Sequence, residues 1–163
     1  MTYLLDANVF IQAKNQYYGF DIVPAFWDWL VQANGTDTVF SIEKVRDELL
    51  GYGDELSVWA RERDQAGGFF LGPDDAVLNG LKDVAQWARG QGFADAVVNE
   101  FLAAADFYLV AHAYSHGHVA VTQEIFEPAI TRKIKIPNAC NGLGAQWMNT
   151  YEMLRTEGAS FNI

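Results

Sequence analysis

The chain has 163 residues, a length that corresponds to one domain with a full hydrophobic core. Half of its residues are hydrophobic and 14% are aromatic, which excludes an intrinsically disordered chain. The formal net charge is −10, from 21 acidic and 11 basic residues, and this acidity taken alone argues against direct binding of nucleic acid phosphates.

The cysteine content and the hydropathy of the chain indicate its expected location in the cell. Cys140 is the single cysteine, so an intrachain disulfide is excluded and a reducing, cytoplasmic location is expected. No apolar run approaches the roughly 18–20 residues of a membrane span, and the N-terminal residues lack the basic flank of a signal peptide. With no repeat or linker in the sequence, we expect residues 1–163 to form a single domain without a membrane partner.

The first part of the chain predicts two strands, each followed by a helix. Thr2–Leu5 predicts a buried strand because its apolar residues do not alternate with polar ones. A helix is expected over Asp21–Ala33, with its first residue as the cap. Thr38–Phe40 predicts a second short strand, and the helix expected over Ser41–Leu50 is capped by its serine.

The middle of the chain continues the alternation. Asp54–Gln65 predicts a helix that opens on an aspartate, and Phe69–Leu71 predicts a third strand. The Gly-Pro-Asp turn at the start of Gly72–Gly90 leads into another helix. Phe93–Ala104 and Ala105–His116 predict two successive helices or one bent helix.

The last part of the chain completes the predicted sheet. His118–Thr122 predicts the fourth strand, Lys133–Ile136 the fifth, and Gly144–Arg155 a last helix. Strands that alternate with helices are typical of crossover units in a parallel sheet. The expected fold class is therefore α/β, with a mostly parallel sheet of four to five strands flanked by helices.

Acidic residues lie near the ends of several predicted strands. Asp6 follows the first strand and Glu124 the fourth, Glu48 lies on the helix after the second strand, and Asp106 begins the helix before the fourth. Because parallel strands end at one edge of the sheet, these carboxylates should gather there and repel one another. A hard divalent cation such as Mg²⁺ relieves that repulsion. Single acids at strand ends are also ordinary turn and cap residues, so this placement leaves both interpretations open.

Four segments in order resemble the motifs of PIN-domain nucleases. They are Tyr3–Ile11 with Asp6, Val45–Leu49 with Glu48, Ala105–Ala113 with Asp106, and Val121–Glu124. Residues Phe26–Leu30 and Lys135–Cys140 look like an uncharacterised PIN subfamily of prokaryotes.

This resemblance implies a PIN-like three-layer sandwich, dependence on Mg²⁺ or Mn²⁺, and endoribonuclease activity that hydrolyses RNA phosphodiester bonds. Many prokaryotic members of the family are the toxin halves of type II toxin–antitoxin pairs. The resemblance therefore implies a cognate antitoxin protein as partner, and it leaves a homodimer open.

The four acids take the catalytic and metal-binding positions that the resemblance implies. We expect Asp6 and Asp106 to be the main metal ligands and Glu48 to orient or deprotonate the attacking water. Glu124 stands where the family more often has the shorter aspartate, so we expect it to bind a second ion or that ion's waters. With metal ions meeting the phosphate, the net acidity no longer excludes RNA.

Polar residues near these acids receive supporting roles. Asn8 and Thr122 are expected to hold carboxylate rotamers by hydrogen bonds, with a helix cap and a strand end as the alternative readings. Arg132, Lys133 and Lys135 form the densest basic patch and are expected to contact the substrate backbone, unless they are only a solvated strand edge.

Two further patterns have a simpler explanation. The aromatic residues within Tyr17–Phe20 and Phe26–Trp29 are expected mostly in the core, with base stacking or a partner surface as the alternative. His112, His116 and His118 lack a further residue that would complete a zinc motif, so we expect them at the surface or at a helix end.

Three functions follow from the sequence. The first is a metal-dependent toxin ribonuclease, and the second is a PIN nuclease in RNA processing or on DNA. The third is a non-catalytic PIN scaffold that binds protein, and the retention of an acid at all four motif positions argues against it.

Overall fold

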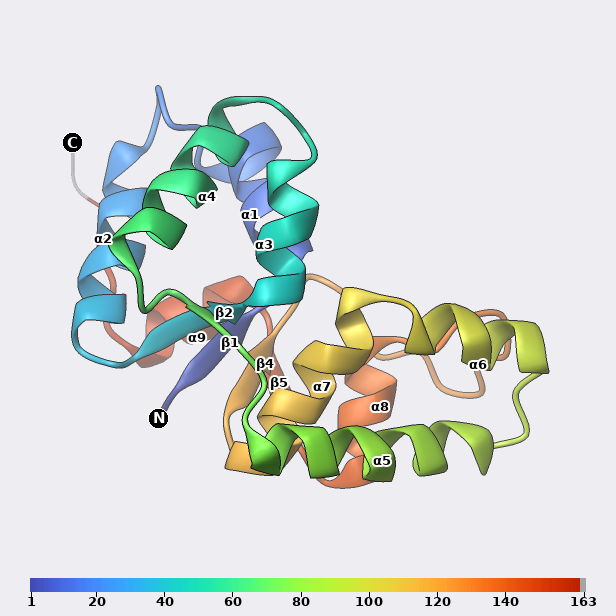
Figure 1. Ribbon diagram of the computed structural model, residues 1–163. Helices are drawn as coiled ribbons and strands as arrows, with labels where there is room; N and C mark the ends of the chain where they lie inside the picture. The colour runs from blue at the N-terminus through green and yellow to red at the C-terminus, as the bar shows by residue number, and fades with distance from the viewer. Residues whose placement is uncertain (162–163) are drawn as a thin grey trace.

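The computed structural model describes residues 1–161 as an α/β fold built on one parallel sheet (Figure 1). Its five strands lie in the order β3-β2-β1-β4-β5, and every neighbouring pair is parallel. They are β1 (Tyr3–Leu5), β2 (Val39–Ile42), β3 (Phe70–Leu71), β4 (Val119–Val121) and β5 (Gln146–Met148). A mostly parallel sheet of four to five strands was the expected architecture, and it is confirmed.

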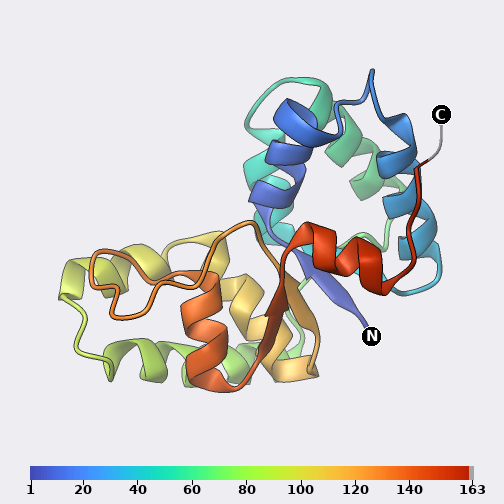
Figure 2. The same cartoon turned by 180° about the vertical axis from the view of Figure 1, so that it is seen from behind.

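Two groups of helices lie on opposite sides of this sheet in both views (Figures 1 and 2). The first group is α1 (Ala7–Gln12), the short π-helical stretch η1 (Ala13–Tyr17), α2 (Pro24–Gly35), α3 (Glu43–Leu50) and α4 (Glu55–Ala66), with α9 (Thr150–Thr156) beside it. The second group is α5 (Asp75–Arg89), α6 (Asp95–Leu102), α7 (Ala105–His116) and α8 (Ile136–Leu143). Because both sides of the sheet are covered, its central strands are buried.

The unbroken apolar strands and most of the aromatic residues lie in or against the hydrophobic core. All three residues of β1 have 0% exposure, as expected for a strand covered on both faces. Phe26 and Trp27 are also buried, and the Trp27 ring centroid lies 5.0 Å from that of Trp59 on α4. The aromatic residues of α2 therefore stabilise the core, as the helical spacing predicts.

The predicted fifth strand is wrong, and the predicted last helix begins too early, since α9 starts at Thr150 rather than at Gly144. Lys133–Ile136 leads into α8, where Pro137 occupies the first turn, a position in which its missing N–H removes no helical hydrogen bond. The fifth strand is instead Gln146–Met148, inside the segment predicted as a helix. Gly144 ends α8 in the left-handed conformation, with φ of 73°, and Asn149 caps α9 by accepting a 2.8 Å hydrogen bond from the N–H of Glu152.

Helix starts also differ in part from the prediction. Asp54 does cap α4 by accepting a hydrogen bond from the N–H of Ser57. Ser41 does not cap α3, because it lies within β2 and its hydroxyl donates a 2.7 Å hydrogen bond to the carbonyl of Leu5 on β1. Helix α2 begins at Pro24 rather than at Asp21. The helix directly after Asp6 has no counterpart in the predicted elements.

Helices α6 and α7 confirm the prediction of two successive helices, and they meet at an angle of 72°. Within residues 1–161, no single helix is long and apolar enough to cross a membrane, and only this bent pair taken together reaches that length and composition. His112 is buried and lies inside α7, so the prediction of a position at the surface or at a helix end is wrong for it. His116 ends α7 as expected and lies 2.8 Å from a carboxylate oxygen of Asp74.

Candidate active site

The four predicted acids come from four different elements near the carboxyl edge of the sheet. Asp6 follows β1 and begins α1, Glu48 lies on α3, Asp106 lies in the first turn of α7, and Glu124 follows β4. The acids are close enough to repel one another. The charges of Asp106 and Glu124 raise the pKa of Asp6, and the charges of Glu124 and Glu48 raise the pKa of Asp106. The fold therefore brings the four acids into one region, as the strand-end argument predicts.

Asp6 is the most enclosed of these acids, with 5% of its surface exposed. Its Oδ1 accepts a 2.8 Å hydrogen bond from the N–H of Ala7, which makes Asp6 the cap of α1, and its Oδ2 accepts one of 3.1 Å from the Thr122 hydroxyl. Burial, followed by the charges of Asp106 and Glu124, raises the pKa of Asp6 well above its usual value despite these hydrogen bonds. A cation at this position would relieve that repulsion.

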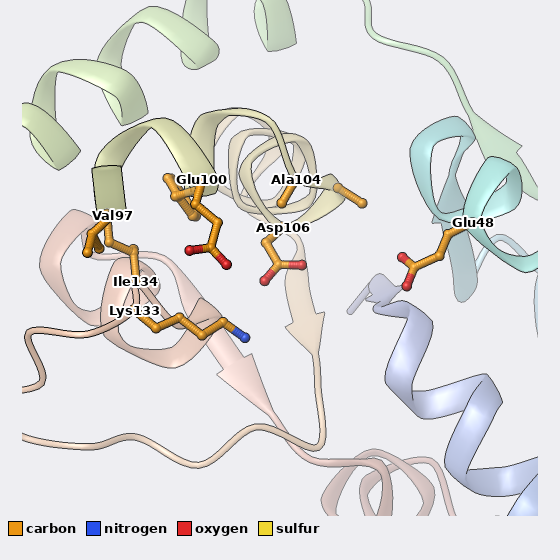
Figure 3. A pocket seen from close by; sticks show the side chains of 9 residues that line it. Glu48, Val97, Glu100, Ala104, Asp106, Lys133 and Ile134 are labelled. Carbon is orange, nitrogen blue, oxygen red and sulfur yellow. The ribbon is translucent and has the colours of Figure 1, made fainter. Parts of the chain in front are cut away.

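Asp106 and Glu48 face one cavity of about 300 Å³. Burial and the charges of Glu124 and Glu48 raise the pKa of Asp106 to about 6, although the nearby Lys133 acts in the opposite direction. Partial burial likewise raises the pKa of Glu48. Figure 3 shows Glu48 across the cavity from Asp106, with the side chains of Glu100 and Lys133 directed into the same space.

Glu100 is a further acid at this cavity that the sequence motifs do not identify. It lies on α6, and the bend between α6 and α7 brings it beside the start of α7 (Figure 3). The predicted helix break near Ala104 is the only sequence signal that points to this proximity.

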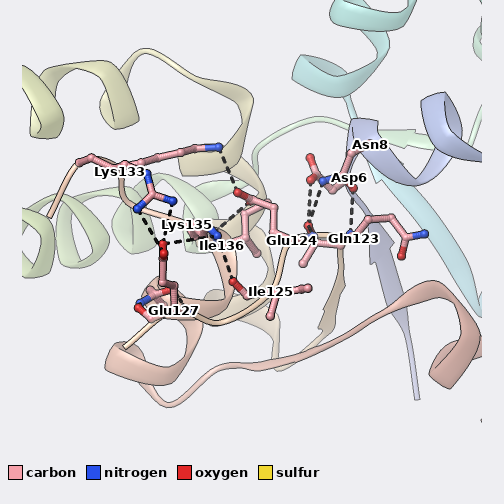
Figure 4. Close-up of polar contacts among 12 residues, drawn as sticks. Asp6, Asn8, Gln123, Glu124, Ile125, Glu127, Lys133, Lys135 and Ile136 are labelled. Atoms are coloured by element: carbon pink, nitrogen blue, oxygen red, sulfur yellow. Dashed lines mark hydrogen bonds and ion pairs between the residues drawn. The ribbon is translucent and has the colours of Figure 1, made fainter. Parts of the chain in front are cut away.

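The Thr122 hydroxyl makes three hydrogen bonds, which link Asp6, Asn8 and Glu124. Its Oγ1 donates to Asp6 and accepts from the Asn8 side-chain amide at 3.2 Å and from the Glu124 N–H at 3.1 Å. Asn8 also accepts a 3.0 Å hydrogen bond from the Gln123 N–H through its Oδ1. Thr122 therefore holds a carboxylate as predicted, whereas the hydrogen bonds of the Asn8 side chain go to Thr122 and to Gln123 (Figure 4). Together the two residues tie the start of α1 to the segment after β4.

Glu124 differs from the other three acids in its contacts, because both of its carboxylate oxygens have partners in the segment that leads into α8. Its Oε2 lies 3.0 Å from the Lys133 ammonium, and its Oε1 accepts a 3.3 Å hydrogen bond from the N–H of Ile136 at the start of α8. Burial lowers the pKa of Lys133, but its hydrogen bond to Glu124 and the charges of Glu124, Asp106 and Asp6 raise it overall. The Lys133 ammonium therefore stays protonated at neutral pH and places a positive charge at the acidic site.

The other two members of the predicted basic patch have a different partner. Arg132 lies 3.0 Å and Lys135 3.7 Å from the same carboxylate oxygen of Glu127. Lys135 also donates to the carbonyl of Ile125 at 3.3 Å. Of the three predicted cations, the structure brings Lys133 to the cavity and places Arg132 and Lys135 in ion pairs of the loop before α8.

The donor chemistry of the site fits a hard divalent cation. Asp6 and Asp106 supply carboxylate oxygens from separate elements, and both are held where their negative charge is unfavourable. Among residues 1–161, no three His, Cys, Asp or Glu side chains are arranged to hold one ion together. Mg²⁺ commonly takes only one or two protein carboxylates and keeps several waters, so two aspartates would be enough to hold it.

Comparisons with known proteins give one family and one fold relative. A family model described as "Domain of unknown function (DUF4411)" matches residues 3–161. Among solved structures, the chain is similar to one described as the crystal structure of FitAcB from Neisseria gonorrhoeae, with 21% sequence identity and a TM-score of 0.56, over 92% of this chain and 99% of that chain. No curated protein matches the chain by sequence. At this identity the likeness shows a shared fold, and the PIN-like α/β class expected from the sequence is confirmed.

Proposed function

Because the chain belongs to the DUF4411 family, whose description assigns no activity, we propose its function from the site: a nuclease that uses a divalent metal ion to hydrolyse RNA phosphodiester bonds. The observation that carries this proposal is the pair of enclosed aspartates, Asp6 and Asp106, whose pKa values are both raised by burial and by neighbouring carboxylates. Neighbouring carboxylates with raised pKa values, one of which lines a cavity, are more typical of functional sites than of structural caps.

Asp6 and Asp106 would hold Mg²⁺ or Mn²⁺. When bound, the ion supplies a Lewis acid for a phosphate oxygen and lowers the pKa of a coordinated water. Thr122 holds the Asp6 carboxylate in one rotamer through its 3.1 Å hydrogen bond, so that the ligand oxygen needs little reorganisation.

Glu48 is suited to accept a proton from the attacking water. It faces the cavity from the side opposite Asp106, and partial burial raises its pKa above the usual glutamate value, toward neutral pH. The Lys133 ammonium faces the same cavity and supplies a positive charge for the substrate phosphate.

RNA as the substrate, and a role as the toxin of a toxin–antitoxin pair, are supported by the four motifs that resemble PIN-domain nucleases. The shared fold with FitAcB agrees with that resemblance. The formal charge of −10 would suit an antitoxin with a basic segment as the partner. A metal-assisted attack by water does not need the ribose 2′-hydroxyl, so the preference for RNA requires its own test.

The test is cleavage of a single-stranded RNA and of DNA of the same sequence, each with Mn²⁺ or with EDTA. We expect Mn²⁺-dependent cleavage of the RNA by the wild type, and a loss of at least 100-fold, about 2.7 kcal/mol, for Asp6→Asn and Glu48→Gln. Asp47→Asn is the matched control, because Asp47 lies beside Glu48 on α3 but pairs with Arg46 at the surface.

Equal activity of Asp6→Asn and wild type would contradict the assignment. Cleavage of DNA in preference to RNA would keep the metal site and overturn the substrate. A wild type that cleaves neither but binds a partner protein would favour the non-catalytic scaffold.

A further inference from the structure

Both carboxylate oxygens of Glu124 have protein partners, and Figure 4 shows these partners on the side of Glu124 away from Asp6. One oxygen pairs with Lys133 at 3.0 Å and the other accepts the N–H of Ile136 at 3.3 Å. Only 12% of the Glu124 side chain is exposed, so both oxygens meet the protein more than solvent. The carboxylate is therefore already satisfied by a cation and a backbone donor.

The length of Glu124 explains these contacts. The resembling PIN motif more often carries an aspartate here, which is one methylene shorter. The Glu124 N–H donates to Thr122, which fixes its backbone at the end of β4, and the longer side chain then reaches the start of α8. The N–H groups at a helix start and the Lys133 ammonium both favour a carboxylate.

Lys133 also reaches toward the remaining acids. Its ammonium lines the cavity shared by Asp106 and Glu48, and the charges of Asp106 and Asp6 act on it in addition to that of Glu124 (Figures 3 and 4). The Lys133 ammonium is thus paired with Glu124 and is close enough to Asp106 for the two charges to interact.

We propose that the Lys133 ammonium, paired with Glu124, takes the place of a second metal ion, so that the site holds a single divalent cation on Asp6 and Asp106. This inference rests on the proposed function. It replaces the sequence-based expectation that Glu124 binds a second ion. One divalent cation and the ammonium together offset three of the four negative charges of the predicted acids, or three of five when Glu100 is included. This reduces the driving force for another ion.

The test is calorimetric titration of the metal-free chain with Mn²⁺, with thermal unfolding of every variant as a check of folding. The wild type should bind one Mn²⁺ per chain, and Asp6→Asn should bind at least tenfold more weakly. Glu124→Gln should still bind one Mn²⁺, with a dissociation constant within about threefold of the wild type.

The variant Lys133→Met tests the proposal more directly, because it should change the number of Mn²⁺ ions bound per chain. With the ammonium gone, the Glu124 carboxylate is free, and we expect a second Mn²⁺ to bind. The double variant Lys133→Met with Glu124→Gln should return to one Mn²⁺, which separates release of Glu124 from a general loss of positive charge. Lys135→Met is the matched control and should bind one Mn²⁺, because Lys135 pairs with Glu127.

The outcomes distinguish the two proposals. Two ions on the wild type, a tenfold weaker ion on Glu124→Gln, or a single ion on Lys133→Met would each overturn this inference while leaving the nuclease proposal intact. A wild type that binds no Mn²⁺ would overturn both.

Discussion

Replacement of Asp106 by asparagine should stabilise the metal-free protein at alkaline pH while removing a ligand of the proposed ion. The pKa of Asp106 rises from 3.8 to about 6 because burial and the charges of Glu124 and Glu48 disfavour its ionised form. A carboxyl with a raised pKa in the folded state favours folding when protonated. Its contribution is complete below pH 3.8 and is lost as the pH rises through about 6.

The size of the effect follows from the same values. At about 1.4 kcal/mol per pH unit, the rise from 3.8 to about 6 corresponds to about 3 kcal/mol lost at pH 8. An asparagine removes this loss but also removes a negative charge from the first turn of α7, which costs up to about 1 kcal/mol. The net gain for Asp106→Asn is therefore about 2 kcal/mol at pH 8, or roughly 4–8 °C in Tm for a chain of this length.

Urea unfolding in EDTA at two pH values measures this gain. At pH 4.5 the folded wild type carries most of the proton, but the unfolded chain, in which this carboxyl has a pKa of 3.8, is mostly ionised. The advantage of Asp106→Asn over the wild type should therefore fall to about 1 kcal/mol. Asp75→Asn is the control, because Asp75 is an exposed acid in the first turn of α5, and its loss should slightly destabilise the chain. A variant no more stable than the wild type at pH 8, or equally stabilised at both pH values, would refute the reasoning.

Three further perturbations test separate parts of the structure. Thr122→Val should lower the free energy of unfolding by about 1–3 kcal/mol, because it leaves a buried oxygen of Asp6 without its side-chain donor, and urea unfolding measures it. Gly142→Ala should cost about 1–3 kcal/mol by the same assay, since a Cβ at this position would lie 2.5 Å from the rigid indole of Trp87. Burial lowers the pKa of His112 from 6.5 to about 4, so stability should fall as the pH drops through this range, and His112→Gln should remove about one proton from that dependence.

For each of these three stability predictions, a specific result would contradict the reasoning. Gly35→Ala is the control for Gly142→Ala, because a Cβ at Gly35 meets no atom within 4 Å, and it should leave stability unchanged or raise it. Equal effects of the two alanines would contradict the close packing of α8 on Trp87. An unchanged unfolding midpoint for Thr122→Val, or an unchanged pH dependence for His112→Gln, would show that the buried contacts invoked do not act as described.

Local sequence patterns predict the central strands well and the last strand poorly. The strands β1 and β4 consist of buried apolar residues, and that signal is local. The strand β5 depends on its pairing with β4, a contact between residues far apart in the sequence, and Gln146 is exposed. By contrast, Ile134 and Ile136 are both buried and resemble one face of a strand, although the backbone there leads into a helix.

The site shows the same division. The predicted acids were identified because Asp6 and Glu124 follow strands, Glu48 and Asp106 lie on helices that connect strands, and all four match the PIN-like motifs. The parallel topology brings them together. The place of Glu100 depends on the angle between α6 and α7, and the pairing of Glu124 with Lys133 depends on the path of the loop before α8. Neither an interhelical angle nor a loop path follows from local periodicity, so these two features required the structure.

The most direct test of the proposed chemistry is analysis of the ends that the wild type leaves on RNA, with Mn²⁺ and with EDTA. Attack by water at a metal site of Asp6 and Asp106 predicts linear phosphate and hydroxyl ends, formed with Mn²⁺ and absent with EDTA. Cleavage that persists in EDTA and leaves 2′,3′-cyclic phosphates would contradict it, because such ends arise from attack by the ribose hydroxyl.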